Sequence, residues 1–88
     1  MDMNRVEKVI ISGVPLKYIE SYLAEIAASI KPGGVYTGPD WEIQVVCTKE
    51  KQFHNISIPQ TKVIFVSDAE TAERLVRSFR MKFMSAGG

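Results

Sequence analysis

Residues 41–48 read Trp-Glu-Ile-Gln-Val-Val-Cys-Thr, and this stretch decides the fold class. Successive side chains of a β-strand point to opposite faces of the sheet. One face would carry Trp41, Ile43, Val45 and Cys47, and the other would carry Glu42, Gln44, Val46 and Thr48. The stretch therefore predicts a strand with one face packed on a core and the other face turned away from it. Cys47 is expected on the buried face, as a small apolar side chain.

Two further extended segments follow at short intervals. Residues 53–58 and 61–66 contain Phe, Ile and Val, which are typical strand residues, and residues 49–52 and 59–60 between them are polar or contain proline. Links this short join antiparallel neighbours, because a parallel connection needs a dozen residues or more. We predict an antiparallel meander of three strands, with His54, Ile56 and Ile58 on one face of the middle strand.

Upstream of the meander, the sequence predicts a strand and a helix. The run Val9-Ile10-Ile11 within residues 6–12 suggests a strand in the interior of the sheet, covered on both faces. A helix then begins at Pro15 and ends at Lys31-Pro32-Gly33-Gly34. Its apolar stripe comprises Leu16, Ile19, Leu23, Ile26, Ala27 and Ile30. Residues 35–37 form a short extended piece before a turn at residues 38–40.

A second helix is predicted after the meander. Ser67 and Glu70 have the capping-box spacing, in which a hydroxyl is followed three residues later by a glutamate. Apolar residues then recur at helical spacing, at Ala72, Leu75, Val76, Phe79 and Phe83. Residues 85–88 are expected to form a flexible end.

The predicted element order is strand, helix, three strands, helix, within one domain spanning residues 1–88. The simplest packing places both helices on one face of a mostly antiparallel four-stranded sheet, a two-layer α+β sandwich. A core this small leaves little stability to hold a strained, buried polar site. We therefore lean towards a protein that is not an enzyme.

The predicted order from residue 15 to residue 84 resembles the layout of double-stranded-RNA-binding domains. That family carries a lysine cluster at the start of its second helix, where this chain has Ser67-Asp68-Ala69-Glu70, which would repel phosphate. The order is also similar to half of the saddle of TATA-box-binding proteins. Both resemblances are topological, so they imply a fold and transfer no functional residue.

The sheet face without helices is the first candidate functional surface. It would carry four sizeable apolar side chains where water is expected, at Val46, Phe53, Ile64 and Val66. A contiguous apolar patch of a few hundred Å² usually marks an interaction site. We therefore predict a protein interface, most simply a homodimer. The alternatives are that the N-terminal segment or residues 35–39 cover this face, or that the alternation changes phase at Pro59.

The second candidate surface is the basic side of the C-terminal helix. Residues 71–88 contain Arg74, Arg77, Arg80 and Lys82 against the single acid Glu73. Such a row could contact a nucleic-acid backbone or another anion. The alternative is a solvated face, since cations near a helix C-terminus are favoured by the helix dipole.

Composition limits the remaining chemistry. The net charge of +1 argues against a wholly basic nucleic-acid binder, and no apolar run approaches the length of a membrane span. The lone Cys47 cannot form an internal disulfide, so we expect a cytoplasmic protein. One histidine and one cysteine are a poor set of metal ligands, and no phosphate-binding motif is present. We predict no cofactor and no metal.

Two minor alternatives remain. A pocket joining Ser12, Tyr36 and His54 would favour a ligand-binding or enzymatic domain. The ending Gly87-Gly88 resembles that of ubiquitin-like sulfur carriers, which have a similar length. Their tails extend from a strand of a β-grasp fold, whereas this pair follows a predicted helix and the chain opens with a strand and a helix. Because the order of the elements differs, we rank this resemblance below the two topological ones.

Overall fold

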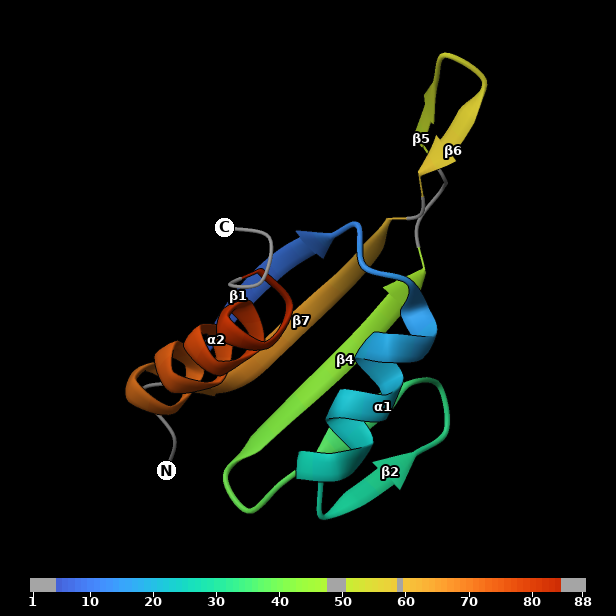
Figure 1. The fold of residues 1–88 in the computed structure, drawn as a ribbon. Helices are drawn as coiled ribbons and strands as arrows, with labels where there is room; N and C mark the ends of the chain where they lie inside the picture. Colours follow the sequence, from blue (N-terminus) through green and yellow to red (C-terminus); the bar gives the residue numbers. More distant parts are fainter. Residues whose placement is uncertain (1–4, 48–50, 59, 85–88) are drawn as a thin grey trace.

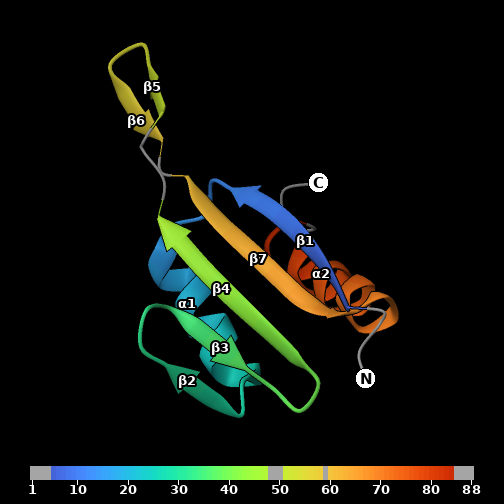
Figure 2. The same ribbon diagram turned by 180° about the vertical axis from the view of Figure 1, so that it is seen from behind.

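The computed structural model describes residues 5–47, 51–58 and 60–84, with the backbone alone for residues 51–53, 57, 58 and 84. In chain order the elements are β1 (Arg5–Ser12), α1 (Leu16–Ile26), β2 (Ser29–Lys31), β3 (Val35–Thr37), β4 (Trp41–Cys47), β5 (Lys51–Phe53), β6 (Ile56–Ile58), β7 (Thr61–Asp68) and α2 (Ala69–Met84). Both helices lie on the same face of the main sheet (Figure 1), and the view from behind shows the opposite face without a helix (Figure 2).

The main sheet has five strands in the order β1-β7-β4-β3-β2. Every neighbouring pair is antiparallel. The predicted two-layer α+β sandwich with two helices on one face is therefore confirmed, although the sheet has five strands rather than four. Three of the four predicted strands are in this sheet, as β1, β4 and β7, and β3 and β2 complete it; β2 occupies residues that the sequence assigned to the first helix.

β1 is an edge strand, which corrects the prediction that residues 6–12 lie in the interior of the sheet. Within the described residues it pairs only with β7, from Arg5 opposite Asp68 to Ser12 opposite Thr61. Ile10 packs against the core on the helix side, while Val9 and Ile11 are about half exposed on the other side, at 48% and 54%. The run Val9-Ile10-Ile11 thus has one covered face and one open face.

α1 ends at Ile26, before the predicted end at Lys31-Pro32-Gly33-Gly34 and four residues before Ile30, the last residue of the predicted apolar stripe. Ala27 already has an extended backbone, and the Ala28 N–H donates to the Thr37 carbonyl at 2.9 Å. Residues 29–31 then pair with residues 35–37 as a hairpin. Gly33 and Gly34 make the turn with φ of +86° and +77°, which glycine adopts without strain. Strand pairing therefore replaces the last helical turn.

Residues 53–58 do not form the middle strand of a meander, which is a second correction. β5 and β6 instead form a separate two-stranded hairpin, and β4 pairs directly with β7. His54 and Asn55 turn the chain between them, both with positive φ (50° and 68°), as two-residue hairpin turns require. The hairpin stands away from the end of the main sheet (Figure 1).

The start of α2 is capped by Asp68 rather than by the predicted pair Ser67 and Glu70. The Thr71 N–H donates to Asp68 Oδ2 at 3.1 Å, which satisfies one of the free donors of the first turn. Ser67 is the last buried residue of β7, and its hydroxyl donates to the Asp68 carbonyl at 2.9 Å. Carboxylates at a helix start are stabilised by the helix dipole.

The core lies between the two helices and the sheet. Its centre is an aromatic cluster in which Phe79 contacts Phe65, Tyr22 and Phe83, with ring centroids 5.8, 6.2 and 4.9 Å away. The buried members of the core are Ile19, Leu23, Tyr36, Ile43, Val45, Val63, Phe65 and Phe79. Cys47 was expected among them but is exposed, because it lies at the end of β4.

Candidate functional site

The strand register places three of the four predicted interface residues on the open face of the sheet. Residues directly opposite one another in antiparallel strands point to the same face. Val66 lies opposite Glu7 and Glu42, Ile64 opposite Val9 and Gln44, and Lys62 opposite Ile11 and Val46. No helix of the described chain covers this face (Figure 2). We call Val9, Ile11, Val46, Ile64 and Val66 the open-face patch.

Phe53, the fourth predicted interface residue, does not lie on the main sheet. It ends β5 in the separate hairpin, and its side chain lies outside the described residues. The interpretation failed because residues 53–58 were taken as one strand in register with β4 and β7. The positive-φ turn at His54 and Asn55 breaks that register.

Sequence reasoning missed Val9 and Ile11, the two most exposed members of the open-face patch. Both alternate with the half-buried Ile10, and Glu7 precedes them on the same face of β1. That alternation was the available signal. It was hidden because a continuous Val-Ile-Ile run is equally typical of a strand buried on both faces.

Charges are distributed unevenly around the open-face patch. Glu7 and Glu42 flank Val66 at one end of the rows, whereas Lys62 lies between Ile11 and Val46 at the other. Val66 is four residues after Lys62 in β7, which is about 13 Å along the strand. The face therefore has an acidic end and a basic end, with Ile64 midway between them.

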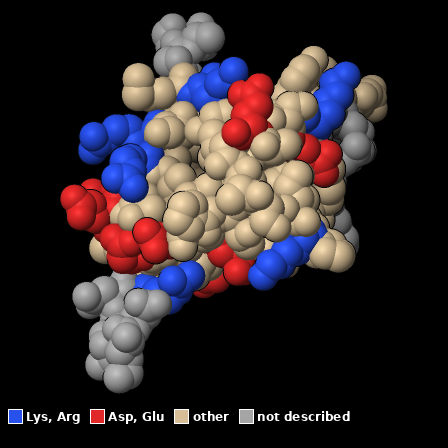
Figure 3. Space-filling model, turned by 90° about the horizontal axis from the view of Figure 1, so that it is seen from below, with Lys and Arg blue, Asp and Glu red and all other residues tan. Residues whose placement is uncertain are grey.

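The four cations of α2 do not form one continuous row. Arg77 and Arg80 line a hollow beside β1 together with Lys8, whereas Lys82 lines a different hollow beside α1 with Glu25 and Ser21. Arg74 is exposed and lines neither. Viewed from below, lysines and arginines are interspersed with acids around an uncharged area (Figure 3). The nucleic-acid contact therefore stays a prediction that this arrangement does not strengthen.

The pocket that would join Ser12, Tyr36 and His54 does not form among the described residues. Ser12 lines a cavity of about 790 Å³ beside β1. Tyr36 is buried on β3, and His54 is at the tip of the hairpin. Burial, with Glu20 nearby, raises the pKa of the Tyr36 hydroxyl, so this group stays protonated at neutral pH and does not serve as a base.

Within residues 5–47, 51–58 and 60–84, no three His, Cys, Asp or Glu side chains come together as metal ligands would. Neither helix of the described chain combines the length and the apolar character needed to cross a bilayer.

Comparison with protein families adds one match, to the archaeal MoaD-like proteins, over residues 7–88. The chain belongs to the archaeal MoaD-like family. This family has a small, ubiquitin-like α+β fold, in agreement with the class of the structure. No curated protein matches the sequence.

The family match changes the ranking of the family resemblances that the sequence suggested. It favours the ubiquitin-like comparison, which we had placed below double-stranded-RNA-binding domains because of element order. The structure retains the difference in element order from the β-grasp fold. Its first described elements are β1 and α1, and its last described element is α2. Gly87 and Gly88 lie within the matched range and outside the described residues.

Proposed function

We propose that this MoaD-like protein is a non-catalytic interaction module that forms a homodimer through the open face of its sheet. The observation that carries the proposal is the exposure of apolar side chains there, with Val9, Ile11 and Val46 at 48%, 54% and 37%. Ile64 lies beside Val9 on the same face, and Val66 lies two residues further along β7. A small domain gains stability when such a face is covered, because apolar area leaves water.

The charges around the open-face patch support a second copy as the partner. Consider two copies stacked face to face, related by a two-fold axis that crosses the strands at Ile64. Lys62 of one copy then lies over Val66 of the other, between Glu7 and Glu42. The same contact occurs twice, as a two-fold interface requires. Opposite charges at such a rim set the register of the two copies.

Sedimentation velocity over a range of concentrations tests this homodimer. We expect a monomer–dimer equilibrium, and we expect Lys62→Glu to raise the dissociation constant about tenfold or more, because it places a third carboxylate between two others. Adding Glu42→Lys to that variant should restore part of the affinity. Lys17→Glu, on the exposed side of α1, is the matched control and should dissociate like the wild type.

Two results would contradict the homodimer. One is a chain that stays monomeric at every concentration. The other is equal weakening by Lys17→Glu and Lys62→Glu, which would show that overall charge, and not the open face, controls association.

We further propose that the protein acts in the cytoplasm. Its single cysteine, Cys47, is exposed and has no cysteine partner within the chain. Exposed thiols of this kind persist where the surroundings are reducing. In intact cells, Cys47 should react with a membrane-permeable maleimide and not with an impermeant one, and full oxidation of the thiol in freshly lysed cells would contradict the proposal.

The family match supports a second candidate, a ubiquitin-like sulfur carrier that uses Gly87-Gly88. The matched range extends through both glycines. The resemblance to ubiquitin-like sulfur carriers implies that the sulfur would be held at the last carboxyl group. This candidate requires that the natural chain ends at Gly88.

Intact-mass spectrometry of the protein isolated from its own host tests the carrier. We expect a species that is heavier than the unmodified chain by the difference between one sulfur and one oxygen atom, located in the C-terminal peptide. A variant extended by one alanine after Gly88 should lack it. A natural chain that continues past Gly88, or a mass that never shows the exchange, would contradict this candidate and leave the homodimer unaffected.

A further inference from the structure

The two edges of the main sheet differ in their capacity to accept another strand. Edge strands present backbone N–H and C=O groups to any chain that comes alongside. β2 is only three residues long and is followed by Pro32, which has no N–H to donate. β1 is eight residues long, contains no proline, and pairs only with β7 among the described residues. β1 is therefore the edge suited to pairing.

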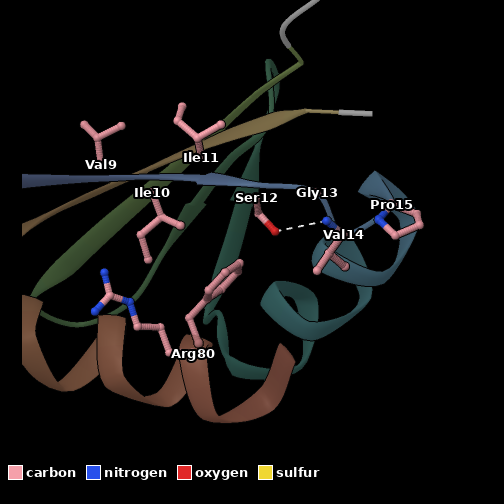
Figure 4. Close-up of a pocket in the computed structure, with 9 residues that line it drawn as sticks. Val9, Ile10, Ile11, Ser12, Gly13, Val14, Pro15 and Arg80 are labelled. Atoms are coloured by element: carbon pink, nitrogen blue, oxygen red, sulfur yellow. Dashed lines mark hydrogen bonds between the residues drawn. The ribbon is translucent and has the colours of Figure 1, made fainter. Parts of the chain in front are cut away.

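A cavity of about 790 Å³ lies beside this edge. In Figure 4, Ile10 and Ser12 point from β1 towards the helix side, where Arg80 of α2 reaches in, while Val9 and Ile11 point to the opposite side. Phe79 and Val14 complete the apolar wall. Ser12 Oγ accepts a hydrogen bond from the Val14 N–H at 3.1 Å, which ties the end of β1 to the start of α1.

The helix side of β1 is also positively charged. Lys8, two residues before Ile10 on the same side of the strand, lines a neighbouring hollow with Arg77 and Arg80. Glu73 is the acid in that lining, so the cations outnumber it three to one. Arg80 lines both the cavity and this hollow. The apolar cavity and the basic hollow are therefore adjacent.

We propose that β1 binds an extended acidic peptide segment as an additional strand of the sheet. Side chains on one face of a strand repeat every two residues, about 6.8 Å apart. The segment therefore carries an apolar side chain that enters the cavity beside Ile10 and Phe79. An aspartate or glutamate two residues away faces Lys8, Arg77 and Arg80. The backbone supplies the hydrogen bonds, as in other cases of strand addition.

Charge argues against a second copy of this chain at the same edge. Edge-to-edge pairing of two β1 strands with all helices on one side of the joined sheet would bring Lys8, Arg77 and Arg80 of both copies towards one another. Repulsion between like charges disfavours that arrangement. The peptide site differs from the open-face homodimer in its charged contacts, which lie on the helix side of β1, although Val9 and Ile11 line the cavity and also belong to the open-face patch.

Fluorescence anisotropy with a synthetic probe tests this site. The probe is a labelled peptide of sequence Val-Glu-Val-Leu-Val-Glu, in which one face carries leucine between two glutamates. We expect saturable binding by the full chain and weakening of about tenfold for Arg80→Glu. Arg74→Glu is the matched control, because it makes the same charge change on α2 outside both hollows, and should bind like the wild type.

Three altered probes separate the contributions of charge and backbone. Replacement of both glutamates by lysine should abolish binding. Two versions N-methylated at alternate amides keep every side chain, and one of them should lose binding because its methyl groups face the β1 edge. Amide shifts of the protein should change along residues 5–12.

The proposal is overturned by any of three results. They are equal weakening by Arg74→Glu and Arg80→Glu, unchanged binding of both N-methylated probes, or failure of the peptide under conditions in which oleate or a single-stranded oligonucleotide binds at Arg80.

Discussion

Gly38 lies where only a glycine fits beside Trp41. A Cβ atom at this position would overlap the indole ring, and the Gly38 N–H donates to the Trp41 carbonyl at 2.9 Å. The ring in turn packs against the edge of the core. This turn joins β3 to β4, so the contact sets how the central strand β4 enters the sheet.

We expect Gly38→Ala to lower the free energy of unfolding by about 1–3 kcal/mol, because the indole must shift to accept a methyl group. Urea titration followed by Trp41 fluorescence measures both the loss and the ring movement. Gly33→Ala is the control, since Gly33 has a φ of +86° but no atom within 4 Å of a Cβ, so it adds backbone strain alone. Unchanged Trp41 emission in Gly38→Ala would refute the contact.

Asp68 makes the stability of α2 depend on pH. Hydrogen bonds from the Thr71 hydroxyl and the Thr71 N–H lower the pKa of the Asp68 carboxyl. A carboxyl with a lowered pKa in the folded state contributes stability above its unfolded pKa of about 3.9. That contribution is lost as pH falls towards the folded pKa. Acid therefore weakens the start of the helix.

Asp68→Asn should consequently show a smaller loss of stability between neutral and acid pH than the wild type. Thermal unfolding followed by circular dichroism at several pH values measures this difference. Asp40→Asn removes a carboxylate from an exposed turn and should retain the wild-type profile. Identical profiles for Asp68→Asn and wild type would show that the cap does not respond to pH.

At the scale of elements, α2 and β4 could be predicted because their patterns are complete within their own residues. The predicted stripe of α2 faces the core, with Ala72 and Phe79 buried. The end of α1 could not be predicted in the same way. Ile26 and Ile30 continue the helical spacing, yet they are 38% and 57% exposed, and Ile30 lies in β2, which pairs with β3. Periodicity within one segment carries no information about a partner strand.

The β5–β6 hairpin is the element whose stability should be most independent of the rest. It forms its own two-stranded sheet and contributes no strand to the main one. Asn55 has a φ of 68°, which a β-branched residue adopts only at a cost of about 1–2 kcal/mol. We expect Asn55→Val to open the hairpin and Asn55→Gly to preserve it.

Amide hydrogen exchange measures this effect. In Asn55→Val, exchange should accelerate at residues 51–58 while protection in β4 and β7 stays at the wild-type level. Loss of protection throughout the main sheet would contradict the independence of the hairpin.

For the whole molecule, composition and hydrophobic pattern were sufficient to predict the two-layer arrangement. They also predicted an open sheet face that carries Val46, Ile64 and Val66. They were insufficient for Phe53, whose strand pairs elsewhere, and for Val9 and Ile11, whose exposure depends on β1 lying at an edge. Strand order is a property of contacts between distant residues, which hydrophobic alternation along one segment does not encode. The cavity beside β1 depends on that same order.

The unequal edges of the main sheet also limit how this protein could polymerise. Growth of a fibre by edge-to-edge addition would require the β1 edge of each molecule to pair with the β2 edge of the next molecule. β2 offers three residues before Pro32 interrupts hydrogen bonding, so eight residues of β1 would find a template less than half as long. Growth through these two edges therefore lacks a matched template at each step, while the domain keeps one long edge available for a single partner strand.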